Sequence, residues 1–342
     1  MTETRADGGH GAAPQAGHRD RVRQPPPLPV VPIVLLGVTV AALVGRYAFE
    51  LVVGTNEAVQ TWSTVFVAIV LQAVPFLVLG VLLSAAISAF LPEGALARVL
   101  PRRSAVAVPV AGVAGGVLPG CECASVPVAG RMVAGGVPAP AALAFLLSAP
   151  AINPVVLVAT AVAFPQNPEM VAARAVGGLL VALVMGWLWS ALGRPGWLRP
   201  PRPAHREGGT RAERFRTTLQ HDFLHAGGFL AVGALAAATL NVVVDPAWTT
   251  GIGGVPVVSV LVLALLAVVL CVCSEADAFV VAGLSGFSLT AKLAFLVVGP
   301  VVDLKLVAMQ VGTFGRRFAQ RFAPATFVVA VAVSALVGGI LL

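Results

Sequence analysis

The sequence predicts an all-α polytopic membrane protein built from two inverted-topology repeats, and three of its features carry that prediction. Hydrophobic residues make up 58% of the chain and charged residues only 11%, where a soluble domain carries roughly a quarter charged residues. The apolar residues form charge-free runs such as 58–92, longer than the ~20 residues that cross the bilayer core as a helix. Two Cys-x-Cys pairs recur 150 residues apart. Because alternating strand patterns are absent, helices rather than a closed barrel are expected to span the lipid.

The N-terminal region is predicted to hold a tail and one extra span. Residues 1–27 are polar and rich in Pro, Gly, His and Arg, a composition typical of a disordered tail, which we expect to be cytoplasmic. Residues 28–49 form an apolar run that is too long for the hydrophobic part of a signal peptide. We therefore predict an extra transmembrane helix there rather than a cleaved leader.

Residues 50–193 and 223–342 are predicted to be two permease repeats, joined by an Arg-rich cytoplasmic linker at 194–222. When residue n is placed beside residue n+150, both Cys-x-Cys pairs align, and Pro150 meets Pro300 without a gap. The apolar runs of the two halves follow the same order. They are 62–91, 104–120, 139–164 and 171–193, then 223–244, 255–273, 289–311 and 323–342.

Equivalent loops of the two repeats carry opposite charge. Loop 92–103 holds three arginines and its counterpart 245–254 none, whereas loop 165–170 holds none and its counterpart 312–322 holds three. Because arginines favour the cytoplasmic side, this pattern predicts repeats of opposite orientation. Inversion requires an odd number of crossings, so one of the four runs in each half must be a re-entrant or broken helix. We predict that the Cys-x-Cys segment is this run; the alternative is eight or nine simple spans with parallel halves.

The four cysteines of the chain are predicted to bind cargo as reduced thiols. They are Cys121, Cys123, Cys271 and Cys273. Thiolate is a soft ligand that favours zinc, copper(I) and other thiophilic centres such as trivalent arsenic. Residues i and i+2 face the same side only in an extended segment, so joint ligation requires unwound backbone, which the Gly and Pro residues before Cys121 favour. In the alternative reading the cysteines pack as small hydrophobes.

Acidic residues accompany both cysteine pairs. Glu122 lies between the first two thiols, Glu275 and Asp277 follow the second pair, and Asp303 lies in the next apolar run. A charged residue at membrane depth costs about 2.5–3.5 kcal/mol on insertion scales and usually marks an ion or substrate pathway. We predict that these acids ligate a cation or carry coupling protons. In the alternative they are solvated at the tips of the hairpins.

Further residues are predicted to support the pathway. They are Pro150, Asn153, Pro154, Lys292, Pro300, Asp303 and Lys305. The prolines free backbone carbonyls inside a span, and Asn153 is expected either to bond one of them or to face the pathway. Lys292 and Asp303 are eleven residues apart, which returns to nearly the same helical face. Two readings are weighed equally: the two residues neutralise each other, or the lysine extends to the interface.

Several other functions are disfavoured. The formal charge of +7 does not indicate nucleic-acid binding, because the arginines lie in short segments between apolar runs. The stretch "GVAGGVLPG" lacks the Lys-Ser/Thr of a phosphate-binding loop. His221 and His225 are spaced for one helix face, and we expect an interfacial pair rather than a metal site. No hydrolase or protease pattern is present, so the sequence predicts neither an enzyme nor a permanently bound cofactor.

The blocks "LPGCECASVPVAG", "SAPAINP" and "CVCSEADAFVVAGL" resemble those of the ArsP/YraQ/YcgR-like family of predicted permeases. The resemblance extends over about residues 60–342 and is nearest to the branch with Cys-Glu-Cys first and Cys-Ser-Glu-Ala-Asp second. It implies a multi-pass permease of the cytoplasmic (inner) membrane. In that family some members export trivalent organoarsenicals through cysteines, and members of this branch often accompany a small membrane partner linked to metal homeostasis.

Taken together, these features predict a secondary-type permease that moves a thiophilic metal or metalloid species, an organoarsenical or zinc among them. One alternative is a membrane subunit that scaffolds or receives metal for a partner protein without transporting alone. A lesser alternative is a membrane thiol oxidoreductase with a reversible Cys121–Cys123 disulfide. The lipid bilayer is the expected surrounding in each case, and the oligomeric state is left open.

Overall fold

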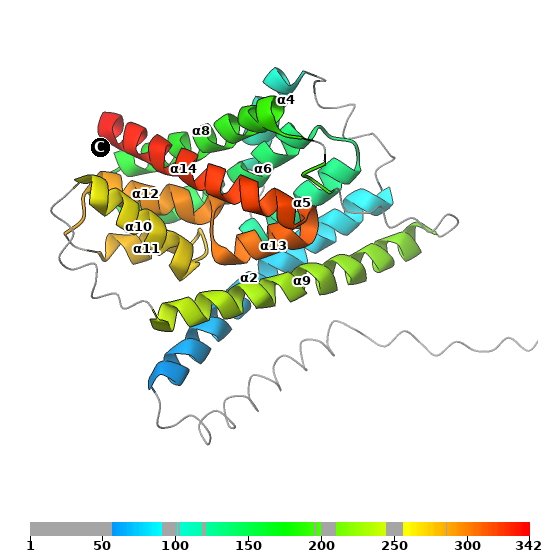
Figure 1. Ribbon diagram of the computed structural model, residues 1–342, viewed down its shortest axis with the longest axis horizontal. Coiled ribbons are helices and arrows are strands. Elements are labelled where there is room, and N and C mark those ends of the chain that lie inside the picture. Colours follow the sequence, from blue (N-terminus) through cyan, green and yellow to red (C-terminus); the bar gives the residue numbers. More distant parts are fainter. Residues whose placement is uncertain are drawn as a thin grey trace, which may run out of the picture. The chain divides into compact units, whose positions relative to one another are not determined.

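The computed structural model describes most of the chain from residue 57 onward. The predicted tail at 1–27 and the predicted extra span at 28–49 lie outside the described residues, as does loop 245–254. Within the described part every regular element is a helix (Figure 1). The described ranges are 57–90, 101, 103–117, 121–194, 196–199, 210–243, 256–284 and 286–342.

The helices occur in the same order in the two halves of the chain. The first half contains α2 (Glu57–Phe90), α4 (Ser104–Gly115), α5 (Glu122–Ala134), α6 (Ala139–Ile152), α7 (Pro154–Ala163) and α8 (Glu169–Leu192). The second half contains α9 (Arg211–Val243), α10 (Pro256–Leu270), α11 (Asp277–Ala282), α12 (Leu289–Val301), α13 (Leu304–Phe314) and α14 (Arg316–Leu341).

Six helical segments of the described chain are long and apolar enough to cross a membrane. Four are the single helices α2, α8, α9 and α14, and two are the composite segments α6–α7 and α12–α13. The shorter apolar helices α4 and α10 complete the set. The prediction of a multi-pass, all-helical membrane protein is therefore confirmed at this level.

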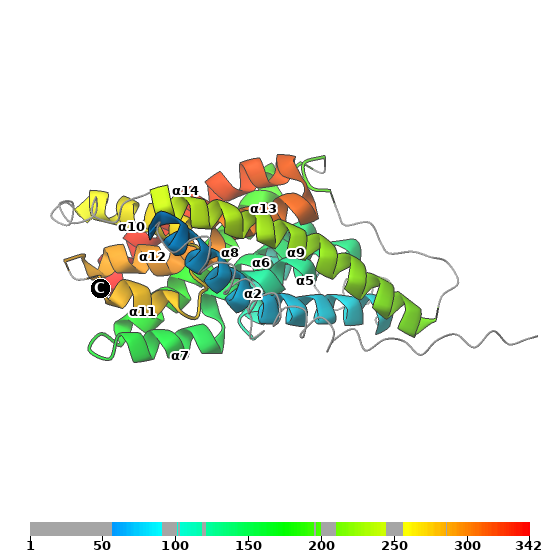
Figure 2. The same cartoon turned by 90° about the horizontal axis from the view of Figure 1, so that it is seen from below.

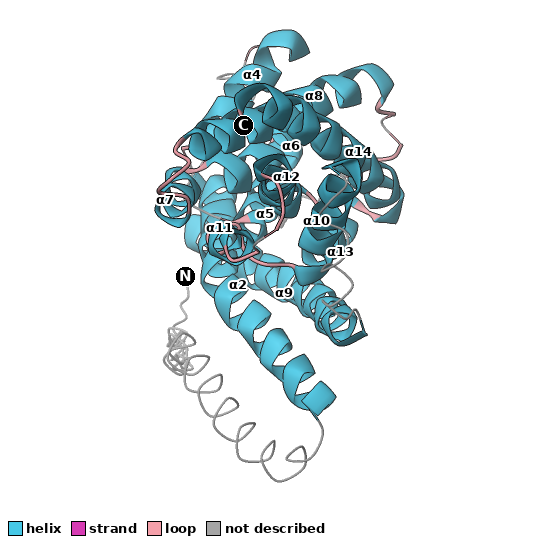
Figure 3. Cartoon of the chain, turned by 90° about the vertical axis from the view of Figure 1, so that its left-hand side faces the viewer, coloured by secondary structure: helices cyan, strands magenta, loops and turns pink. Residues whose placement is uncertain are grey.

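The two composite segments form the centre of the helical bundle. In their most apolar windows, 72% of the residues of α6–α7 and 78% of those of α12–α13 are buried, against 28–33% in the other four spans. Helix α6 packs against α4 and α8, helix α12 packs against α10 and α14, and α8 contacts α14. Figure 3 shows α6 and α12 surrounded by the other helices. The outer helices expose leucine and valine side chains, as expected of surfaces that face lipid.

Each composite segment is broken by one extended polar residue. Pro154 has no N–H, and the residue before a proline avoids helical geometry, so the chain is extended at Asn153. Asn153 then caps α7, because its Oδ1 accepts from the backbone N–H of Val156 at 3.0 Å. Asp303, at the equivalent position in the second half, caps α13 in the same way through the N–H of Leu306 at 2.6 Å. Two unwound points are thereby placed inside the most buried helices.

Helices α2 and α9 pack against each other (Figure 2) and also against the inner helices through glycines. A Cβ atom at Gly80 in α2 would lie 2.4 Å from the Cα of Ala124 in α5. A Cβ at Gly233 in α9 would lie 2.4 Å from the Cα of Lys305 in α13. Both separations are far below van der Waals contact, so these close approaches require glycine.

Two segments predicted as loops are helical in part. Helix α9 begins at Arg211, inside the segment predicted as a linker, because arginines favour helix once the helix has left the lipid. Within the predicted loop 312–322, only Gly315 separates α13 from α14. Its φ of 94° lies in the left-handed region that glycine tolerates. The three arginines of this segment therefore lie in the first turns of α14.

The close approach of α9 to α13 predicts a strong position dependence for glycine substitution. We expect Gly233→Ala to lower the free energy of unfolding by about 1–3 kcal/mol, because the added methyl group overlaps backbone. Gly228→Ala on the same helix is the control, since nothing lies within 4 Å of its Cβ position. That variant should be neutral or stabilising by up to ~1 kcal/mol. Unfolding of both variants in detergent provides the comparison, and equal effects would contradict the packing described here.

Candidate functional site

A fully buried lysine lies at the centre of the bundle. The Lys305 Nζ is 2.5 Å from Glu122 Oε1 and 3.3 Å from Asp303 Oδ2. It also donates to the backbone carbonyl of Cys271 at 3.1 Å. A buried ammonium is tolerated only when it is paired and hydrogen-bonded, and here one carboxylate comes from each half of the chain. Lys305 therefore joins the two halves at one point.

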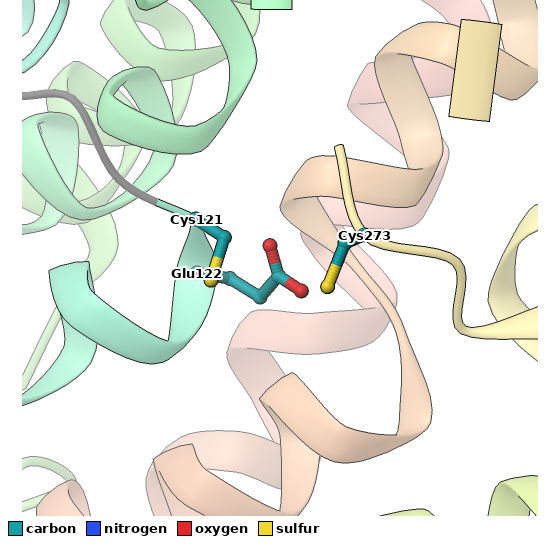
Figure 4. Close-up of side chains that lie close together, drawn as sticks. All are labelled: Cys121, Glu122 and Cys273. Carbon is teal, nitrogen blue, oxygen red and sulfur yellow. The ribbon is translucent and has the colours of Figure 1, made fainter. Parts of the chain in front are cut away.

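Two thiols, one from each half of the chain, converge on the same place. The Sγ atoms of Cys121 and Cys273 and a carboxylate oxygen of Glu122 all lie within 4.8 Å of one another (Figure 4). Cys123 lies two residues further along, in the first turn of α5, and is fully buried. Lys305 Nζ contacts Cys273 Sγ at 3.6 Å. We call these six residues the thiol–carboxylate cluster: Cys121, Glu122, Cys123, Cys273, Asp303 and Lys305.

The cluster residues of the first half, Cys121, Glu122 and Cys123, lie at the start of α5. Cys121 is the N-cap of this helix and is extended, while Glu122 lies in its first turn. The positive end of the helix dipole favours a carboxylate at this position. Cys121, Glu122 and Cys123 are each at most 1% exposed. Cys121 is thus extended, whereas Cys123 is helical.

The second half delivers only one of its two thiols. Cys271 has a φ of 51°, unusual for a residue other than glycine, and this turn breaks the alternation expected of an extended pair. Its carbonyl faces Lys305, but its thiol donates to the Val268 carbonyl at 3.4 Å. The side chain packs in a separate apolar cluster with Ile69, Ala234 and Ala237. Of the four sulfurs predicted to be able to share one centre, the structure places those of Cys121 and Cys273 together, whereas Cys271 packs in the separate apolar cluster.

The two lysines have different surroundings from those predicted. Asp303 uses Oδ1 to cap α13 and Oδ2 to pair with Lys305, rather than pairing with Lys292 as in one of the two readings of the sequence. The extended residue at the helix break turns Asp303 away from the face that continuous helical spacing would give it. Lys292 instead donates to the Ala282 carbonyl at 3.4 Å and lies 5.9 Å from the centroid of the Phe164 ring.

The acidic residues after the second cysteine pair are held by an arginine that the sequence analysis passed over. Arg174 of α8 forms a two-pronged ion pair with Asp277, at 2.8 and 2.7 Å, and donates to the Ser274 carbonyl at 3.1 Å. Both side chains are at most 2% exposed. Glu275 is half-buried beside Ser274, and its Oε1 has no hydrogen-bond partner among the described residues. A charged residue inside the apolar run 171–193 was the available signal for Arg174.

The predicted supporting residues lie at the helix breaks. Asn153 donates through Nδ2 to the Ala149 carbonyl at 3.0 Å, one of the two roles considered for it. Pro150 and Pro300 are buried inside the last turns of α6 and α12, and Pro154 opens α7. These residues shape the unwound points inside the two composite segments.

The charged residues of the cluster carry one net negative charge, which a bound cation would neutralise. Glu122 and Asp303 contribute two negative charges and Lys305 one positive charge. Glu122 Oε2 is buried and has no hydrogen-bond partner among the described residues. An unsatisfied buried carboxylate oxygen is costly, and a metal ion would satisfy it. The donor set of thiols and a carboxylate suits a soft or borderline cation.

Comparison with known proteins identifies similar chains. The model of the family ArsP_1, described as "Predicted permease", matches residues 58–341. The chain is 37% identical to the UPF0718 protein YcgR of Bacillus subtilis (strain 168), over 81% of this chain and 97% of that protein. It is 30% identical to a "putative two-component membrane permease complex subunit" of Streptococcus mutans, over 80% of this chain and 94% of that protein. No solved structure matches.

The Arg174–Asp277 pair predicts a large stability effect. We expect Arg174→Met to lower the free energy of unfolding by about 3–5 kcal/mol, because it leaves the Asp277 carboxylate buried without a partner. The double variant Arg174→Met/Asp277→Leu removes both charges and should regain most of that loss. Thermal or denaturant unfolding in detergent measures both variants, and a double variant as unstable as the single one would contradict the ion pair.

Proposed function

Because the chain belongs to the predicted-permease family ArsP_1, we propose that it is a secondary-type permease that moves a thiophilic metal or metalloid species across the cytoplasmic membrane. Family membership makes the protein a membrane transporter rather than an enzyme. The observation that carries the substrate proposal is the convergence of Cys121 and Cys273 beside Glu122 in the buried centre.

The spacing of these donors supports a shared ligand. Zinc lies about 2.3 Å from thiolate sulfur and 2.0–2.2 Å from carboxylate oxygen, so two ligands of one ion are at most about 4.6 Å apart. The atoms of Cys121, Glu122 and Cys273 lie within 4.8 Å of one another, so small side-chain rotations complete a site. A pair of thiols also suits trivalent arsenic, whose thiophilic chemistry matches that of soft metals.

Lys305 is proposed to hold the site when no cargo is bound. Its ammonium neutralises Glu122 and Asp303 at 2.5 and 3.3 Å, which makes the buried carboxylates tolerable. A cationic cargo that engages Glu122 would compete with the ammonium for the same oxygen. The Glu122 carboxylate is then neutralised by Lys305 in the empty state and by the cargo in the loaded state. A carrier that returns empty across the membrane requires both.

We further propose that the two halves are inverted repeats with re-entrant Cys-x-Cys segments. Helix α4 has 12 residues, about 18 Å at 1.5 Å per residue, too short for a core of ~30 Å. Its counterpart α10 has 15 residues. The contacts of α4 with α6 and of α6 with α8 are matched by those of α10 with α12 and of α12 with α14. Broken helices that meet at a substrate site are typical of such transporters.

A second candidate function is that of one subunit in a two-component complex. The relative from Streptococcus mutans is named as a putative subunit of such a permease complex. In this reading the chain scaffolds or receives metal for a small membrane partner and does not transport alone. The thiol–carboxylate cluster would then be the site at which metal is received.

The substrate proposal predicts that the cysteines are not equivalent. We expect Cys121→Ser and Cys273→Ser to reduce transport by at least the ~10-fold that loss of an outer-shell partner costs a metal site. Cys271→Ser is the matched control, because its hydroxyl can keep the hydrogen bond to the Val268 carbonyl outside the cluster. The measurement is the cellular content of zinc, copper, cadmium, arsenite and methylated arsenite in a deletion strain carrying each variant. An unchanged profile in all strains would rule out the soft-ligand site.

The two candidate functions predict different behaviour in liposomes. The purified wild-type chain alone should move the cargo identified in cells, while Cys273→Ser liposomes show background flux. If flux requires a co-purified membrane partner, the two-component reading replaces the single-chain permease. Metal binding to the purified chain, measured in detergent, separates this outcome from loss of the site.

A further inference from the structure

A second polar site lies away from the thiol–carboxylate cluster, where the Arg-rich segments meet. A cavity of about 450 Å³ opens between α5, α9, α13 and the start of α14. Its charged or titratable side chains are Arg131, Arg199, His221, Asp222, His225 and Arg316. We propose that this cavity binds a phosphate-type oxyanion, either a free phosphate group or the headgroup of an anionic lipid.

Arg199 and Arg316 provide positive charge without a carboxylate partner among the described residues. Arg199 is held in place by its backbone, whose N–H donates to the Phe314 carbonyl at 3.0 Å. Its side chain runs along Gly315, with Cδ 3.6 Å from the position a Cβ would take there. Because Gly315 has no side chain and a φ of 94°, Arg199 can lie against the turn that leads into Arg316. The two guanidinium groups therefore line the same cavity.

The one acidic residue of the cavity is already neutralised. Arg131 Nη2 donates to Asp222 Oδ1 at 2.6 Å, and Arg131 Nε donates to Oδ2 at 3.1 Å. The Ser84 hydroxyl donates to Oδ2 at 2.8 Å. Because the charges of Arg131 and Asp222 sum to zero, the net charge of these four side chains is the two positive charges of Arg199 and Arg316. That excess matches a phosphate group of charge −1 to −2.

Two histidines form part of the cavity wall. His221 and His225 stack with their ring centroids 5.7 Å apart, one turn apart on α9. His225 lies 3.0 Å from the Gly312 carbonyl through Nε2, and because a carbonyl only accepts, Nε2 must carry the proton. This contact needs Gly312, since a Cβ there would lie 2.3 Å from the Phe229 ring. The two histidines, for which the sequence predicts an interfacial pair rather than a metal site, thus line this cavity.

The shape and chemistry favour a phosphate group over a carboxylate or chloride. Planar arginine forks match phosphate oxygens with two parallel hydrogen bonds. Arg316 also begins α14, and the first N–H groups of a helix favour an anion. The volume of about 450 Å³ exceeds that of inorganic phosphate and admits an attached glycerol. Basic pockets between helices on the cytoplasmic side are known to take anionic headgroups.

The test compares two charge-matched double variants of the full chain in neutral detergent. At saturating inorganic phosphate or phosphatidylglycerol, we expect the unfolding midpoint of the wild type to rise by at least about 2 °C over chloride or phosphatidylcholine at equal ionic strength. Arg199→Gln/Arg316→Gln should weaken the apparent affinity by more than ~10-fold. Arg216→Gln/Arg317→Gln, which changes exposed arginines outside the cavity, should bind as the wild type does.

The measurements with inorganic phosphate and with phosphatidylglycerol identify the source of the phosphate group. A rise with inorganic phosphate indicates a soluble ligand, and a rise with phosphatidylglycerol alone indicates a lipid headgroup. If Arg199→Gln/Arg316→Gln does not fold, a second measurement replaces that variant. The ³¹P signal of the ligand that stabilises the wild type should broaden when wild-type protein is added, and sulfate should reverse the broadening. The proposal is overturned if neither ligand stabilises or broadens with the wild type, or if both double variants respond equally. None of these readouts depends on metal transport.

Discussion

The buried ammonium of Lys305 is the contact on which the centre of the protein depends. Its pairing with Glu122 and Asp303 draws together the start of α5 and the break before α13. Its bond to the Cys271 carbonyl holds the loop that carries Cys273. Glu122 and Asp303 would otherwise repel each other in a medium of low dielectric constant. The convergence of the thiols is therefore a consequence of charge neutralisation as much as of packing.

The same rule applies to the other buried charges. Arg174 pairs with Asp277, and Arg131 pairs with Asp222. In each of these described ion pairs, as in Lys305–Glu122, one partner comes from the first half of the chain and the other from the second. Buried ion pairs add little net stability over apolar packing, but a broken one is costly. They therefore specify how the halves dock, while apolar contacts supply most of the attraction.

At the helix breaks, polar side chains provide hydrogen-bond partners for the backbone. Helix breaks inside lipid are tolerated only where the freed groups find partners. At Asn153 the side chain satisfies both the Ala149 carbonyl and the Val156 N–H, and at Asp303 the carboxylate caps one helix while pairing with Lys305. Each break thus turns a polar side chain toward the interior without leaving the main chain unsatisfied.

The sequence alone determined the membrane-helical class, the register of 150 residues and the residue types of the centre, because composition and spacing are local properties of a chain. It also placed Glu122, Asp303 and the cysteines near helix breaks. Only the tertiary structure decided which thiols meet. The left-handed turn at Cys271 directs its thiol away from the cluster. Lys305 rather than Lys292 forms the ion pair with Asp303, and Arg174 forms the ion pair with Asp277. These choices join residues about 100 positions or more apart or follow a break in the helix, where helical periodicity carries no information about which side chains come into contact.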